Sequence, residues 1–184
     1  VQDGDDEIPD YKMKDDNYGS EDDNGKVIPI KNEVSFYELL TTQLGMLYLD
    51  ERLQKVAEQI IGSLDDDGYL RREIASIVDD LAFRQNVQTN DKEVAELIKQ
   101  IQQFDPAGIC ARDLQECLLL QLHRKREEGS AVRIAIKVLT EYFDEFTKKH
   151  YDKIQRGLDL SDDGLRAVIN QIIKLNPRPG GNLG

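Results

Sequence analysis

Apolar residues recur at intervals of three and four along almost the whole chain after residue 34, and this spacing limits the folds open to it. In the first run, Phe36, Leu39, Leu40, Leu44 and Leu47 fall on one face of a helix. Nowhere after residue 34 do apolar and polar residues alternate with the period of two that marks a half-buried strand. The sequence therefore predicts an all-α fold, made of two packed helical subdomains of the helical bundle type.

The expected helices carry recognisable start and stop signals. Ser35 and Glu38 have the spacing of a capping box, and Asp50, Asn90 and Ser161 stand where further helices should begin. The expected helices lie near 35–48, after Asp50, near 71–83, between Asn90 and Pro106, between Ala111 and Gly129, over 134–146, over 148–156 with a stop at Gly157, and between Ser161 and Pro177.

The chain begins with a strongly acidic stretch. Residues 1–30 carry ten Asp and Glu against three Lys and contain few apolar residues. Such a stretch cannot bury enough surface to offset the entropy of ordering it. We therefore expect residues 1–33 to be a disordered acidic linker. A solvated spacer is its simplest role, and mimicry of nucleic acid against a basic surface is the alternative.

The overall charge and hydropathy limit the possible partners. A net charge of −12 argues against a chain that binds nucleic acid by itself, because duplex binding gains affinity by neutralising phosphates. No apolar run approaches the roughly 20 residues of a membrane span, and no charged-then-apolar leader opens the chain. We expect neither a membrane protein nor a secreted one. Because the first residue is Val rather than Met, we interpret the chain as an excised piece of a longer protein.

The two cysteines point to a reducing compartment. Cys110 and Cys117 lie in a segment with helical periodicity, where seven residues correspond to about 10 Å. A disulfide needs Cα atoms within roughly 7 Å. Both cysteines are expected to be reduced core thiols of a cytoplasmic protein.

Patterns that carry catalysis or bind metal are missing from the sequence. His123 and His150 stand apart from any ligand cluster, and no glycine-rich phosphate loop or Gly-x-Ser-x-Gly motif occurs. The acidic run 64–70 resembles a calcium loop, yet Ser63 and Ile74 occupy its first and last ligand positions. The run is better explained as a turn that stops a helix. We expect no cofactor, no metal and no enzymatic activity.

The run from Phe104 to Gly108 breaks the helical pattern near the middle of the chain. This break predicts a first helical subdomain over 34–104 and a second over 105–176, with 177–184 as the start of a truncated continuation. Phe104 and Pro106 are expected to pack at the hinge, with contact to a partner as the alternative.

Three stretches together carry a family resemblance. They are IGSLDDDGYL at 61–70, IQQFDPAGICARDLQECLLLQL at 101–122 and LNPRPG at 175–180. Their order and spacing resemble the core-binding region of the bacterial sigma-54 (RpoN) factors over about residues 34–180. The middle stretch is the most specific of the three.

The resemblance implies a transcription initiation subunit that docks on core RNA polymerase and is built from two helical subdomains. It further implies that promoter DNA and the activator ATPase are contacted only through segments absent from this fragment. Those segments are a glutamine-rich one before residue 1 and a helix-turn-helix after Gly184. The fragment is expected to be a monomer, with carboxylates steering it toward basic polymerase surface and a few apolar anchors supplying the affinity.

Seven residues are candidates for contact with the polymerase: Asp65, Asp66, Asp67, Tyr69, Arg112, Asp113 and Glu116. Each group has a structural alternative. The Asp-rich turn could simply end a helix, and Asp113 and Glu116 could complement a helix N-terminus while Arg112 bridges to that turn. The basic pairs and runs, Arg71-Arg72 and Arg124-Lys125-Arg126, are expected to be solvated faces.

Two other functions remain open from the residues alone. The second and third helices could form a helix-turn-helix that binds DNA directly. The chain could also be a generic helical scaffold or a chaperone-like module.

Overall fold

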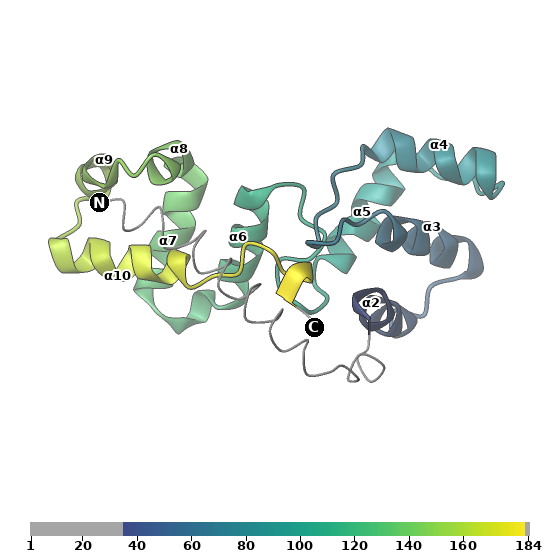
Figure 1. Ribbon diagram of the computed structural model, residues 1–184, viewed down its shortest axis with the longest axis horizontal. Helices are drawn as coiled ribbons and strands as arrows, with labels where there is room; N and C mark the ends of the chain where they lie inside the picture. Colours follow the sequence, from purple (N-terminus) through teal and green to yellow (C-terminus); the bar gives the residue numbers. More distant parts are fainter. Residues whose placement is uncertain (1–34, 183–184) are drawn as a thin grey trace, which may run out of the picture. The chain divides into compact units, whose positions relative to one another are not determined.

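The computed structural model describes residues 35–182, and these consist of helices joined by loops and turns (Figure 1). No strand occurs within this range, so the all-α prediction is confirmed. The predicted acidic linker, residues 1–33, lies outside the described residues. In chain order the elements are α2 (Phe36–Gly45), α3 (Glu51–Gly62), α4 (Ile74–Arg84), α5 (Asp91–Ile101), α6 (Leu114–Arg124), η2 (Arg126–Glu128), α7 (Ser130–Glu141), α8 (Phe143–Thr147), α9 (Tyr151–Leu158), α10 (Asp162–Ile173) and η3 (Gly180–Asn182).

The caps expected from the sequence start the helices of the structure. At α2, Glu38 N donates to Ser35 Oγ at 3.0 Å and Ser35 N donates to Glu38 Oε1 at 3.4 Å, which completes a capping box. Asp50, Asn90 and Ser161 accept from backbone N–H groups in the first turns of α3, α5 and α10. Each cap satisfies a donor that the helix cannot pair, which stabilises it by about 1 kcal/mol.

Several predicted boundaries were wrong where backbone groups bond outside their helix. The third helix begins at Ile74 rather than 71, because the Arg72 carbonyl accepts from the side chain of Arg112. The fifth begins at Leu114 rather than 111, because the Ala111 carbonyl accepts from Leu70 N. The first helix ends at Gly45 instead of 48.

The sixth and seventh predicted helices also differ from the structure. The run over 134–146 divides at Tyr142 into α7 and α8. The predicted stop at Gly157 was wrong, since α9 continues to Leu158 and ends at Asp159 in the left-handed conformation (φ 54°). Gly157 instead makes room for a neighbour, because a Cβ there would collide with the phenol of Tyr142.

The buried apolar side chains form two large clusters. The first comes from α2 to α5 and continues through Phe104 to Cys110, while the second comes from α6, α7, α9 and α10. Tyr69, Ala111 and Cys117 make a third, small cluster. None of the helices within 35–182 is both long and apolar enough to cross a bilayer.

Both cysteines are buried and free, as predicted. The geometric reason given by the sequence was wrong, because Cys110 precedes α6 with a left-handed backbone (φ 68°) while Cys117 lies within the helix. Burial raises the pKa of Cys117 and raises that of Cys110 to about 12, so both are inert thiols at neutral pH.

The α2–α3 loop is short and strained at one residue. Met46 N donates to Gln43 O and Leu47 N donates to Leu44 O, each at 3.0 Å, so the loop continues directly from the last turn of α2. Tyr48 then adopts the left-handed conformation (φ 53°), which costs a residue with a Cβ about 1–2 kcal/mol.

One ion pair ties α3 to α5. The guanidinium of Arg52 meets the carboxylate of Glu93 through two contacts of 2.6 and 2.7 Å, and the Thr89 hydroxyl donates to the same carboxylate at 2.6 Å. These donors, Arg52 first, lower the pKa of Glu93 to about 2.

We predict that Glu93→Gln lowers the free energy of unfolding at neutral pH and that its effect shrinks in acid. The folded-state pKa lies below that of the unfolded chain, so the stabilisation is fully present above about pH 4.5 and is lost as pH falls toward 2. Urea denaturation between pH 7 and pH 3 measures the difference between variant and wild type. Glu96→Gln, an exposed change on the same helix, should track the wild type. A difference for Glu93→Gln that stays constant with pH would contradict the assignment.

Candidate functional site

Segments that lie far apart in the sequence meet at one place, which we call the junction (residues 64–72, 102–121 and 176–180). Except for Arg71 and Arg72, these residues belong to the three stretches singled out in the sequence. In Figure 1 the yellow C-terminal segment returns toward the middle of the chain, and hydrogen bonds join it there to the turn after α3 and to α6. The junction is the candidate functional site.

The Asp-rich turn is a closed local structure. Gly68 N donates to Asp65 O and Asp65 N donates to Tyr69 O, both at 2.9 Å, with Gly68 in the left-handed region (φ 95°). Arg71 Nη1 lies 2.5 Å from Asp65 Oδ2 and 3.3 Å from Asp67 Oδ1. The same guanidinium stacks 4.5 Å from the centroid of the Tyr69 ring. Backbone hydrogen bonds and ion pairs within residues 65–71 therefore stabilise the turn.

The segment after the mid-chain break pairs with this turn along the backbone. Cys110 N donates to Gly68 O at 2.8 Å, and Leu70 N donates to Ala111 O at 2.9 Å. The side-chain amide of Gln102, which is 5% exposed, donates to Cys110 O at 3.0 Å. Buried polar groups are thereby satisfied on both segments.

Arg112, Asp113 and Glu116 organise the start of α6. Asp113 is the N-cap and accepts from Glu116 N at 2.9 Å, while Glu116 Oε1 accepts from Arg112 N at 2.7 Å. The Arg112 guanidinium donates to the carbonyls of Leu70 and Arg72, each at 2.9 Å. Arg112 thus reaches the backbone that follows the Asp-rich turn rather than its carboxylates.

A C-terminal strap, residues 176–180, closes the junction. Gln121 pairs with Asn176 through both ends of its amide: Nε2 donates to Asn176 O at 2.6 Å and Oε1 accepts from Asn176 N at 2.8 Å. The Tyr69 hydroxyl donates to Pro177 O at 2.7 Å, and Gly180 N donates to Asp67 O at 3.0 Å. The strap therefore contacts both α6 and the turn.

Two glycines allow the strap to lie against the turn. A Cβ on Gly180 would come within 2.7 Å of Asp66 O and of Gly68 N, and a Cβ on Gly68 would come within 2.9 Å of Gly180 N. These neighbours are backbone atoms, which cannot rotate away. Only glycine fits at this contact.

The mid-chain break is held from both sides. On α2, the side-chain amide of Gln43 accepts from Asp105 N and donates to Asp105 O, both at 2.8 Å. On α6, Arg124 donates to Asp105 Oδ1 at 2.8 Å and to Phe104 O at 2.5 Å. Phe104 is buried, as hinge packing requires, and the peptide bond from Asp105 to Pro106 is cis.

The basic residues expected on solvated faces are mostly paired. Arg124 binds the break as described, Arg71 binds the Asp-rich turn, and Arg72 pairs with Asp80 of α4. All three residues are exposed, as predicted, and each guanidinium also has carboxylate or carbonyl acceptors within reach that a one-dimensional pattern does not reveal.

The seven candidate residues divide by exposure. Tyr69 is only 3% exposed, and burial raises its pKa. Asp66 and Asp113 are exposed, while Asp65, Asp67, Arg112 and Glu116 are half-buried. A polar hollow beside the turn is lined by Leu64, Asp65, Asp66, Asp67 and Arg178. Of the two exposed candidates, Asp66 lines this hollow together with Asp65 and Asp67, while Asp113 is not among its lining residues.

The sequence missed most of the residues that build the junction. Gln43, Gln102, Gln121 and Asn176 act through amide hydrogen bonds to distant backbone, and Gly180 acts through its missing side chain. The available signal was that Gln43 and Gln121 stand at positions where the helical periodicity otherwise places apolar residues. Within 35–182, no three His, Cys, Asp or Glu side chains gather where they could hold a metal ion.

Comparison with known proteins gives a family match over most of the chain. Residues 29–184 match the family described as "Sigma-54 factor, core binding domain". The chain is 33% identical to an RNA polymerase sigma-54 factor of Pseudomonas aeruginosa (strain UCBPP-PA14) over 81% of this chain and 30% of the relative. It is 35% identical to the factor of Acidithiobacillus ferridurans over 82% of this chain and 30% of that relative. It is 33% identical to the factor of Azotobacter vinelandii over 78% of this chain and 28% of that relative. The chain thus spans less than a third of the length of these relatives.

We predict that Gly180→Ala destabilises the chain by about 1–3 kcal/mol, because the added methyl group must displace backbone of the Asp-rich turn. Gly181→Ala is the matched control, since the nearest atom to its Cβ is a side-chain nitrogen of Arg178 at 3.5 Å, an ordinary contact. Urea denaturation of both variants measures the difference. Equal stability of the two variants would show that the strap does not rest on the turn.

Proposed function

Because the chain belongs to the sigma-54 factor core binding domain family, we propose that it docks on core RNA polymerase as one region of a sigma-54-type transcription initiation factor. The observation that carries the proposal is the family match over 29–184, which includes every segment of the junction. The coverage of about 30% of each relative supports a region of a longer factor rather than the whole of one.

The proposed mechanism is docking by a preassembled body, without catalysis. Surfaces that are rigid before binding lose less entropy on association. The junction provides such rigidity, because its segments are joined by backbone hydrogen bonds and by buried amides with partners. We further propose that the subdomains 34–104 and 105–176 move as one unit on the polymerase. The two large apolar clusters support a division into two parts, although the first cluster extends past residue 104 to Cys110.

The seven candidate residues take different roles in this proposal. Asp66 and Asp113, whose side chains are exposed, would face the polymerase. Tyr69 and Arg112 would act as positioning residues, because one is buried against the strap and the other binds the backbone after the turn. Asp65, Asp67 and Glu116 would do both, because each is half-buried and also accepts hydrogen bonds inside the junction.

The charge of the chain supports a basic docking surface on the polymerase. At a net charge of −12, carboxylates accelerate association with a basic surface and contribute less to the final affinity. We propose that the chain acts as a monomer in the bacterial cytoplasm, in keeping with its two free cysteines. Contacts with promoter DNA and an activator ATPase are assigned to other regions of the full-length factor.

The helix-turn-helix alternative gains no support from the arrangement of α3 and α4. A helix-turn-helix joins its two helices by about three or four residues. Here α3 ends at Gly62 and α4 begins at Ile74, and the Asp-rich turn lies between them. Its carboxylates would repel phosphate.

A direct binding measurement tests the proposal. The immobilised chain should retain purified bacterial core RNA polymerase at moderate salt, and the association rate should fall as ionic strength rises. A random DNA duplex should not bind. Failure to retain the polymerase would contradict the proposed function, and salt-sensitive binding of the duplex would favour the DNA-binding alternative.

We predict that Asp66→Arg slows association with core RNA polymerase by about threefold to tenfold, because it reverses a charge at the proposed docking surface. Asp163→Arg makes the same change on α10, where the side chain is 96% exposed, and should leave the rate unchanged. Stopped-flow association kinetics at low salt measure both variants. An equal effect of the two would indicate that only net charge matters and would remove the Asp-rich turn from the interface.

A further inference from the structure

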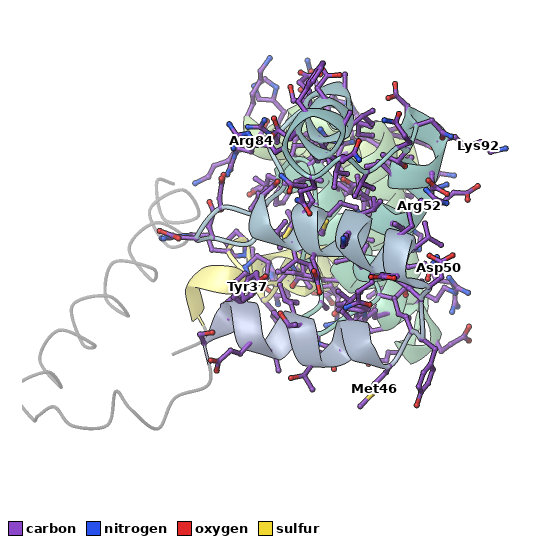
Figure 2. The ribbon with its side chains drawn as sticks, turned by 90° about the vertical axis from the view of Figure 1, so that its right-hand side faces the viewer. Tyr37, Met46, Asp50, Arg52, Arg84 and Lys92 are labelled. Carbon is purple, nitrogen blue, oxygen red and sulfur yellow. The ribbon has the colours of Figure 1, made fainter. Side chains whose placement is uncertain are left out.

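The α2–α3 loop exposes two large apolar side chains that are separated by one residue in the sequence. Tyr48 is 90% exposed and Met46 is 69% exposed. Figure 2 shows Met46 at the end of α2 opposite to Tyr37, with Asp50 on the same side of the view. Water surrounds most of both side chains, so neither contributes to the apolar clusters of the described residues.

The stability of the fold does not explain why a tyrosine stands at position 48. Its left-handed backbone (φ 53°) is one that Gly or Asn adopts more easily, and its ring gains almost no burial in return. A residue that costs stability without a contact inside the chain is typical of a site kept for function. Strain and exposure are independent observations, and they coincide at this residue.

The loop holds both side chains in place. Leu47 and Leu49, which alternate with the exposed residues, pack against the first apolar cluster. The last turn of α2 fixes one end of the loop, and Asp50 fixes the other by accepting from Leu53 N at 2.8 Å. Tyrosine and methionine are enriched in the buried centres of protein interfaces, and pre-positioned anchors bind at a lower entropic cost.

The charges beside the loop indicate the chemistry of the partner. Asp50 and Glu51, which come after Leu49, are exposed, while the next residue, Arg52, is paired with Glu93. The local balance is therefore negative. Such a rim favours a basic partner and disfavours both the acidic residues 1–33 of this chain and the same loop of a second copy.

We infer that Tyr48 and Met46 are apolar anchors of the docking interface, and that they insert into an apolar pocket bordered by Lys or Arg on core RNA polymerase. The inference rests on the proposed function and names the residues that supply affinity. It places these anchors at the α2–α3 loop, apart from the acidic surface of the junction.

Equilibrium binding of the 184-residue chain to purified core RNA polymerase tests this inference. Tyr48→Asn should weaken binding by about thirtyfold, the loss typical of an interface hot spot, and Met46→Ala should weaken it by several-fold. Because Asn accepts the left-handed backbone, the melting temperature of Tyr48→Asn should equal or exceed that of the wild type. Binding of Tyr48→Asn within about twofold of the wild type would overturn the inference and leave the proposed function intact.

Phe83→Ala is the matched control for loss of an exposed aromatic side chain. Phe83 is 85% exposed and precedes Arg84, which Figure 2 places far from Met46 and Asp50. Its removal should leave binding unchanged, and an equal loss would overturn the specific role of Tyr48. If the wild-type chain itself does not bind, the proposed function fails and the inference fails with it.

A photocrosslinking amino acid at position 48 identifies the occupant. The crosslinked polymerase peptide should contain apolar residues flanked by Lys or Arg, and an acidic peptide would overturn the inference. Light scattering tests whether a second copy of the chain binds the loop instead. A wild-type dimer that Tyr48→Asn converts to a monomer would show that the loop binds a second copy, which would also overturn it.

Discussion

Two backbone hydrogen bonds, from Cys110 to Gly68 and from Leu70 to Ala111, join the turn after α3 to the segment that leads into α6. The rest of the structure depends on this pairing, because the turn belongs to the helices of the first apolar cluster while α6 contributes to the second. The strap after α10 then binds both the turn and α6. Helix packing alone would leave the relation between the clusters loosely specified, and the paired backbone defines it.

The junction gains its specificity from buried polar groups that are fully paired. Gln102 and Gln121 are buried, and leaving either amide without a partner would cost about 1–3 kcal/mol. Their hydrogen bonds to Cys110 and Asn176 therefore favour one arrangement of the segments over all others. The α2–α3 loop contrasts with this: Tyr48 is strained and exposed, and we propose that its partner is core RNA polymerase. A rigid body with exposed anchors at Tyr48 and Met46 fits the proposed docking role.

The sequence predicted the features that local chemistry determines. Helix periodicity and the caps at Ser35, Asp50, Asn90 and Ser161 depend on residues within a few positions of one another, and these predictions were confirmed. The start of α6 and the role of Gly180 depend on segments that are distant in the sequence, so no local pattern reveals them. Resemblance located the three stretches of the junction without explaining why they occur together. Their shared hydrogen bonds supply that explanation. The contact of the seven candidate residues with the polymerase stays a proposal.

Hydrogen–deuterium exchange of the chain, alone and with core RNA polymerase, tests the central claim most directly. The claim is that a junction assembled before binding presents a fixed docking surface. In the free chain, the amides of Leu70, Cys110 and Gly180 should exchange as slowly as those of the helix cores, and added polymerase should slow exchange in the loop between α2 and α3. Rapid exchange of the junction amides in the free chain, with protection only after polymerase is added, would contradict the account.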